Sequence, residues 1–485
     1  MRLFHSRQSF LDKLDDRLQR DGFRSVSAHN VLQNGERIYN RGNTERSNFY
    51  VFVKTSALGV FVKYFDPDPC KPLDSCMKRE FFFAGSDETV KKRVSELSDG
   101  IHAASGHKPT DAYSVVTHGH WKDDGTKRLY FDDGASSARL ILRDLMFFHT
   151  DFDFTGHHNI IDFPTFEQIR ASEHRLGITK ALATELTLPL SKGKSNGPHF
   201  MLWSYDPDTM AELHDSFLLR RDNKMIYPSL APCLDLDVFL DWLGEKLRAK
   251  SIAVGIAHPF EDVSLPLLKP VPIGLFSVIG DEIHSHAHTS DPFERKLRRF
   301  DLSRALALAK LFGNGVAEYN STIWATSRKI SDPETLDFIE KLKRKYGIEG
   351  DTANVYGRLI SKYLEETFGL FRYFEPDFHV SPSSGSLLFY LGRRVYSKLS
   401  TGHTWFLSDK GRPGVKDVVL AMHDERRKFE TAVRWKIKNG AACTDDSING
   451  FLYTSEKLYW EVVKAMNHFR AFLWESKRRI GDIFR

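Results

Sequence analysis

Short apolar runs alternate with helix-like segments between residues 111 and 421, and this alternation constrains the fold most strongly. The run "AYSVVTHGH" precedes "ASSARLILRDLMFF", and "LDVFLDWLGEKLRAK" precedes "SIAVGIAHPF". A strand followed repeatedly by a helix favours parallel strands connected by helices. We therefore expect an α/β domain over residues 109–421, with strands that run in parallel.

Two flanking segments follow different patterns. Residues 1–108 predict a small α+β unit, with a β-hairpin around Ala57-Leu58-Gly59 and a helix that begins after Ser86. Residues 422–485 predict a C-terminal helical extension, because apolar and aromatic residues recur there at helical spacing. No motif in residues 1–108 indicates what that unit does.

The composition excludes several classes of protein. A hydrophobic content of 41%, a charged content of 27% and a net charge of +5 are typical of a globular protein, and they give no argument for nucleic-acid or membrane binding. The four cysteines are scattered, so we expect no disulfide scaffold. No signal-peptide core or apolar run of membrane-spanning length is visible, and we expect a cytoplasmic protein without membrane insertion.

Histidines and carboxylates gather where the apolar runs of the α/β domain end. His118 and His120 are two residues apart after "AYSVV", so they project to the same side of an extended chain. The C-terminal ends of strands in a β/α barrel meet on one face, where active sites are built. The same pattern recurs in order along the chain at Asp124, His157, His158, Glu185, His199, His258, Asp377 and His379.

This series resembles the polymerase and histidinol phosphatase (PHP) family, over roughly residues 111–421. The family's HxH and following Asp-Gly are matched by "HGH" and Asp124-Gly125, and its His-Pro motif by His258-Pro259. Two motifs depart from the family pattern. His157 stands where an aspartate is usual before His158, and Glu375-Pro376 replaces small residues before Asp377. The resemblance implies a distorted (β/α)7 barrel that holds two or three divalent metal ions, of Zn, Mn or Fe.

The resemblance also implies a set of ligands for each ion. One ion would take His118, His120, Glu185 and Asp377. A second would share Glu185 and add His199 and His258, and a third would take Asp124, His158 and His379.

Clustered metal ions suit the hydrolysis of phosphate esters, because they activate water and hold phosphoryl oxygens. We expect a metal-dependent phosphoesterase that acts on a small phosphorylated metabolite or nucleotide. His379 or His258 would protonate the leaving group, and Asn159, Lys192 and Lys194 would contact the substrate. Two alternatives stay open: a nuclease acting on nucleic-acid ends, and a non-catalytic scaffold that binds a partner. The sequence does not identify the substrate or the oligomeric state, or say whether His284, His286 and His288 are functional.

Overall fold

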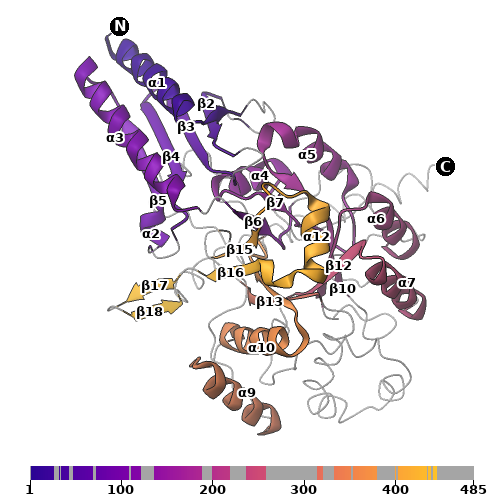
Figure 1. Cartoon of the computed structure of the whole chain (residues 1–485). Coiled ribbons are helices and arrows are strands. Elements are labelled where there is room, and N and C mark those ends of the chain that lie inside the picture. The colour runs from indigo at the N-terminus through magenta and orange to yellow at the C-terminus, as the bar shows by residue number, and fades with distance from the viewer. Residues whose placement is uncertain are drawn as a thin grey trace, which may run out of the picture.

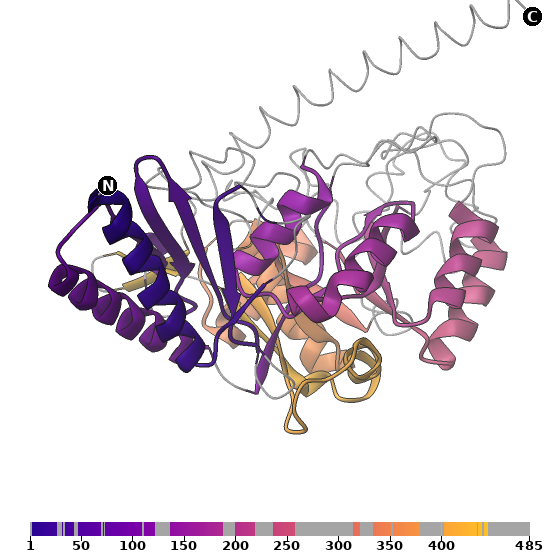
Figure 2. The same cartoon turned by 90° about the horizontal axis from the view of Figure 1, so that it is seen from above.

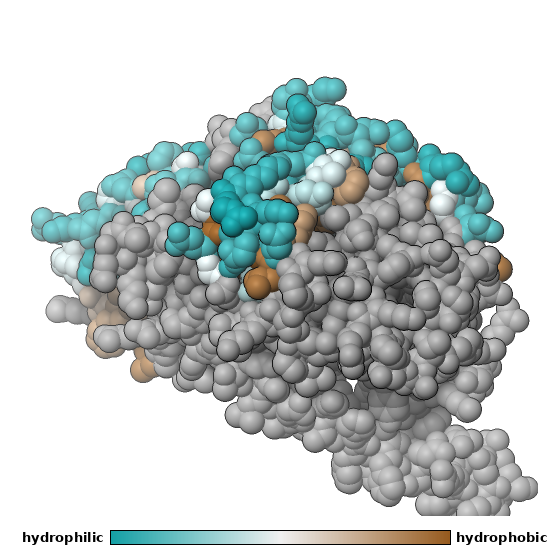
Figure 3. All heavy atoms as spheres, turned by 90° about the horizontal axis from the view of Figure 1, so that it is seen from below, coloured by the Kyte–Doolittle hydropathy of each residue, from teal (hydrophilic) through white to brown (hydrophobic). Residues whose placement is uncertain are grey.

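The fold is taken from a computed structural model of the whole chain. The structure describes residues 2–26, 32, 34–42, 47–68, 71, 73–108, 111–121, 136–187, 199–218, 236–257, 314–320, 333–350, 353–378, 399, 402–433, 435–438 and 441–444. Among these residues, no helix is both long and apolar enough to cross a bilayer. The described residues on the face shown in Figure 3 are mostly hydrophilic.

The N-terminal unit is built on a five-stranded antiparallel sheet in the order β1-β2-β3-β4-β5. The hairpin predicted at Ala57-Leu58-Gly59 is confirmed, since Ser56 pairs with Gly59 across a two-residue turn. The predicted helix start is also confirmed, because the Ser86 side chain accepts a hydrogen bond from the Thr89 backbone N–H at 3.2 Å. The elements of this unit are α1 (Arg2–Arg20), β1 (Arg24–Ser25), β2 (Glu36–Asn40), β3 (Tyr50–Ser56), β4 (Gly59–Phe65), α2 (Leu73–Cys76), β5 (Met77–Phe82) and α3 (Asp87–Gly106).

Both faces of this N-terminal sheet are buried. Helices α1 and α3 lie side by side on one face (Figures 1 and 2), where Val51 and Val53 of β3 pack. On the opposite face Tyr50 and Phe52 pack with residues of helix α4 (Ala138–Phe147). Successive residues of a strand point to opposite faces, so a strand buried on both sides needs a continuous apolar run such as "YVFV". The unit therefore shares one hydrophobic core with the α/β part.

The α/β part contains two larger sheets. A six-stranded sheet has the order β14-β13-β12-β11-β10-β8, and a five-stranded sheet has the order β16-β15-β6-β7-β9. Their strands are β6 (Ala112–Val116), β7 (Phe152–Asp153), β8 (His157–His158), β9 (Thr179–Lys180), β10 (Leu182–Thr187), β11 (His199–Ser204), β12 (Ile252–Ile256), β13 (Gly315–Asn320), β14 (Phe371–Glu375), β15 (Gly402–Leu407) and β16 (Phe429–Val433).

The two sheets enclose a common core. Val115 of β6, Phe152 of β7, Trp203 of β11 and Tyr373 of β14 all belong to this one cluster of buried side chains. Helices pack against the outer side of the six-stranded sheet (Figure 1) in a second core. The helices of the α/β part, besides α4, are α5 (Phe163–Leu176), α6 (Pro207–Leu213) with its π-helical extension η1 (His214–Leu218), α7 (Leu236–Arg248), α9 (Pro333–Tyr346), α10 (Ala353–Phe368) and α12 (Val415–Asp424).

The predicted parallel arrangement is confirmed in part. Parallel pairs join β6 to β7, β7 to β9, β8 to β10, β12 to β13, and β13 to β14. Strand β11, however, is antiparallel to both β10 and β12, and β15 is antiparallel to β6. The architecture is thus a mixed α/β fold, and closure into a seven-stranded barrel stays a prediction.

The helical prediction for the start of the C-terminal extension is wrong. After α12 a short 3₁₀ turn, η5 (Arg426–Lys428), leads into strand β16, which pairs with β15. Strands β17 (Trp435–Lys438) and β18 (Ala441–Thr444) then form a separate antiparallel pair. The segment "FETAV" has no strong helical preference, and pairing with a neighbouring strand decides its conformation. The helix predicted further on lies outside the described residues.

Candidate metal centre

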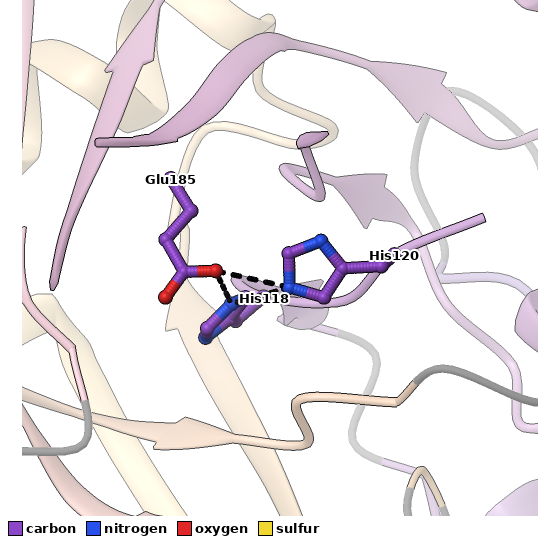
Figure 4. Close-up of side chains that lie close together, drawn as sticks. All are labelled: His118, His120 and Glu185. Atoms are coloured by element: carbon purple, nitrogen blue, oxygen red, sulfur yellow. Dashed lines mark hydrogen bonds and ion pairs between the residues drawn. The ribbon is translucent and has the colours of Figure 1, made fainter. Parts of the chain in front are cut away.

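Four segments of the α/β part bring the first group of predicted ligands together. His118 and His120 follow β6, His158 ends β8, Glu185 lies in β10, and Asp377 follows β14. His118, His120 and Glu185 are completely buried, and the side chain of Asp377 is only 5% exposed. Figure 4 shows both imidazoles directed at the Glu185 carboxylate.

The donor atoms of these side chains converge on one point. Glu185 Oε2 lies 2.8 Å from His118 Nε2, 3.0 Å from His120 Nε2 and 3.1 Å from His158 Nδ1. The two Nε2 atoms are 3.0 Å apart. Asp377 Oδ1 lies 3.6 Å from His118 Nε2 and 3.7 Å from His120 Nε2. Three nitrogens and two carboxylate oxygens therefore surround one small, buried volume.

Two glycines allow these segments to approach so closely. Gly119 forms a β-bridge with Phe378, and a Cβ atom on Gly119 would lie 2.4 Å from the Phe378 ring. A Cβ atom on Gly156 would lie 2.3 Å from the Ala183 carbonyl oxygen. Only glycine fits where two chains approach at such distances. The glycines of "HGH" and "GHHN" thus permit the contacts that assemble the site.

Strand register places His158 against Glu185. The two residues are direct partners in the parallel pairing of β8 with β10, and the His158 ring stacks on His120 at a centroid distance of 4.4 Å. Asn159 then turns the chain with a positive φ of 53°, which asparagine tolerates better than most residues. Its backbone N–H donates to the Glu185 carbonyl at 2.8 Å. This contact gives Asn159 a local structural role, and its predicted contact with substrate stays a prediction.

The electrostatics of the site favour a cation. Burial disfavours the charged form of His118, but the carboxylates of Glu185, Glu375 and Asp377 outweigh burial and raise the pKa of His118 well above its usual value. Several carboxylates in a buried volume require positive charge nearby. The donor set also fits a metal ion, since adjacent ligands of a tetrahedral zinc ion lie about 3.3 Å apart. His118, His120 and Glu185 form a candidate metal-binding group, with their donor atoms all within 4.8 Å of one another.

The other predicted site residues cannot be placed around this group. His199 begins β11, where it pairs with Thr187, but only its backbone is described. The rest lie outside the described residues: Asp124, Lys192, Lys194, His258, His284, His286, His288 and His379. Whether they complete a second or third metal position stays a prediction.

The sequence reasoning missed Glu375, the last residue of β14. Its carboxylate is completely buried and accepts a hydrogen bond from His118 Nδ1. A signal was present in the sequence, because Glu375 is a carboxylate at the end of the apolar strand "FRYFE", two residues before the predicted ligand Asp377.

A second missed contact surrounds His157. Its Nε2 lies 3.3 Å from Asp162 Oδ2, which also accepts from Trp121 Nε1 at 3.3 Å. The Asp162 carboxylate in addition caps α5 by accepting from the Thr165 backbone N–H at 3.0 Å. Burial opposes ionisation of Asp162, but these hydrogen bonds hold its pKa well below the usual range. The network fixes the β8–α5 connection beside His158.

The N-terminal unit contains another group of potential ligands, Asp66, Asp68 and His107. Here the positive charge comes from the chain itself. Lys71 Nζ donates to Asp66 Oδ2 at 2.7 Å, and His107 Nδ1 lies 2.8 Å from Asp66 Oδ1. Burial raises the pKa of Asp66, but the contacts with Lys71 and His107 lower it overall. An ammonium group in direct contact disfavours a metal ion at this position.

Comparisons with known proteins include a distant structural likeness. No family model matches the chain, and no curated protein matches it. A crystal structure from Bifidobacterium adolescentis, of a protein provisionally described as a metal-dependent phosphoesterase, aligns with a TM-score of 0.29 and 10% identity. The alignment covers 56% of this chain and 88% of that one. At this similarity the likeness carries no argument, and the buried histidine–glutamate group remains the basis for assigning a function.

Proposed function

We propose that this chain is a metal-dependent phosphoesterase. The observation that carries the proposal is the convergence of His118 Nε2, His120 Nε2 and His158 Nδ1 on Glu185 Oε2, each within 3.1 Å. Neutral imidazoles mixed with carboxylates are ligands typical of Zn²⁺, Mn²⁺ or Fe²⁺. The motif series that resembles the PHP family supports phosphate ester hydrolysis as the reaction.

The described residues have distinct roles in this proposal. His118 and His120 would bind an ion through Nε2, and Glu185, whose Oε2 lies within 3.1 Å of three imidazole nitrogens, would be the ligand shared between ions. Asp377, whose Oδ1 faces the Nε2 atoms of both histidines, would add a second carboxylate ligand. A bound ion of this kind lowers the pKa of a coordinated water to about 7 and thus supplies a nucleophile at neutral pH. Burial of the site excludes bulk water, which strengthens the interaction of each ligand with the ion.

The direct test measures metal content and hydrolysis together. Purified wild-type protein should contain two or three equivalents of Zn, Mn or Fe by elemental analysis, and it should cleave bis(p-nitrophenyl) phosphate. The His118→Ala/His120→Ala double variant should lose most of the metal and the hydrolysis. His102→Ala, a change at an exposed histidine of α3, is the matched control and should retain both.

Two results would contradict the proposal. A wild-type protein that is metal-free and cannot be reloaded with any of the three metals would exclude a metal centre. A metal-loaded protein that leaves mono- and diesters of phosphate intact would exclude the phosphoesterase assignment while retaining the metal site.

A further inference from the structure

Glu375 contacts His118 of the candidate metal centre on the side of the ring opposite to the predicted ligands. His118 Nε2, His120 Nε2 and His158 Nδ1 all lie within 3.1 Å of Glu185 Oε2. Glu375 Oε1 instead accepts a hydrogen bond from the other ring nitrogen, His118 Nδ1. Both side chains are completely buried. The imidazole of His118 is therefore held between two carboxylates.

The backbone around Glu375 is fixed on both sides. The Thr117 hydroxyl donates to the Phe374 carbonyl at 2.9 Å, and the Phe374 N–H donates to the Thr404 hydroxyl at 2.9 Å. On the other side, the His120 N–H donates to the Phe378 carbonyl at 2.7 Å. The bonds from Thr117 and His120 join the end of β14 to the segment after β6, and the bond to Thr404 joins β14 to β15. The relative position of Glu375 and His118 is thus set by the backbone.

An ionised carboxylate can only accept hydrogen bonds, so His118 Nδ1 must carry the proton in this contact. A neutral imidazole protonated at Nδ1 has its lone pair on Nε2, the atom directed into the site. A carboxylate bonded to the far nitrogen of a metal-binding histidine orients the ring and makes the ligand more basic. The geometry around Glu375 matches this arrangement.

We propose that Glu375 is a positioning residue of the metal centre, which fixes the orientation and tautomer of His118 and thereby strengthens metal binding. The inference rests on the metal centre of the proposed function but not on its phosphoesterase activity. It also explains a departure from the PHP pattern, in which small residues precede the aspartate of the closing motif. Here Glu375 occupies one of those positions and orients the His118 ring.

The test measures metal affinity in the full-length chain, without any activity assay. Apo protein is titrated with Co²⁺ and Zn²⁺ against a chromophoric chelator, and the visible spectrum of bound Co²⁺ is recorded. Glu375→Ala should lower the affinity about a hundredfold, and Glu375→Gln, which keeps a hydrogen-bond acceptor, about tenfold. Both variants should bind as many equivalents as the wild type, and Glu375→Ala should alter the Co²⁺ spectrum.

The control is Glu318→Gln on the neighbouring strand β13. Glu318 is also a buried carboxylate, but it accepts from Arg372 at 2.7 Å, so its change should leave metal affinity unaltered. Wild-type affinity in Glu375→Gln together with an unchanged Co²⁺ spectrum in Glu375→Ala would overturn the inference. Loss of a whole equivalent would also overturn it, because Glu375 would then be a ligand itself. A wild type that binds metal with this dependence on Glu375 but hydrolyses no phosphoester would refute only the proposed function.

Discussion

A buried ion pair joins the N-terminal sheet to the α/β part, and its removal is the sharpest test of the shared core. Arg143 of α4 donates from Nη2 to Glu36 Oε1 of β2 at 2.7 Å, and from Nη1 to Oε2. Both side chains are at most 1% exposed. Glu36→Gln would leave the guanidinium without its bidentate carboxylate. Breaking a buried pair in this way costs about 3–5 kcal/mol, a large part of the 5–15 kcal/mol by which proteins are typically stable.

The chain provides a reporter for this experiment. All eight tryptophans lie after residue 120, so tryptophan fluorescence follows the part of the chain beyond the N-terminal unit. Circular dichroism follows both parts. With an m-value of about 3 kcal/mol/M, a loss of 4 kcal/mol lowers the urea midpoint by about 1.3 M. Because the sheet and α4 share one core, both signals should shift together.

Two further variants define the outcome. The double variant Glu36→Leu/Arg143→Met should recover most of the stability, because apolar residues can replace a buried pair without loss. Glu80→Gln, at an exposed carboxylate of β5, should change stability by less than about 0.5 kcal/mol. The reasoning is refuted if Glu36→Gln costs under 1 kcal/mol, or if circular dichroism shifts while fluorescence does not.

Three other predictions concern protonation, packing and metal. Burial lowers the pKa of Lys63 to about 6. Between pH 6 and the usual lysine pKa of about 10.5, the folded state therefore binds fewer protons than the unfolded state. The free energy of unfolding should rise with pH over this range, by up to about 1.4 kcal/mol per pH unit. Lys63→Met should flatten this rise and stabilise the protein at pH 7, as measured by urea unfolding at pH 7 and 9; parallel pH profiles would contradict this. Gly119→Ala should lower the free energy of unfolding by about 1–3 kcal/mol and weaken metal binding, because the new Cβ overlaps the Phe378 ring. Gly106→Ala, where the new Cβ would meet no atom within 4 Å, should change neither. A chelator should lower the melting temperature of the wild type but not that of the double-histidine variant, and equal shifts in both would exclude stabilisation through the site.

Much of the candidate site could be predicted because its information is local. Strand geometry puts His118 and His120 on one side, and Glu185, His158 and Asp377 each follow or end an apolar run. The glycines between and before the histidines mark close approach of the backbone. Residue type and spacing, together with the resemblance to the PHP family, therefore predicted the five side chains that the structure brings together.

Other features were beyond local reasoning. The Glu375–His118 contact joins residues 257 positions apart, and nothing in either segment specifies its partner. The antiparallel direction of β11 and the strand conformation of β16 likewise depend on which neighbours they pair with. Short apolar segments fit a helix or a strand almost equally, so pairing and burial decide between them.

The sequence by itself determined which residues are candidate metal ligands and which apolar runs carry them, because alternation along a strand is a property of the chain. The tertiary structure decided which carboxylate faces which imidazole nitrogen, and that the N-terminal sheet is buried against α4. Both depend on the order of strands and the packing of layers. Long-range burial and hydrogen bonding select that order from alternatives that local preference leaves close in energy.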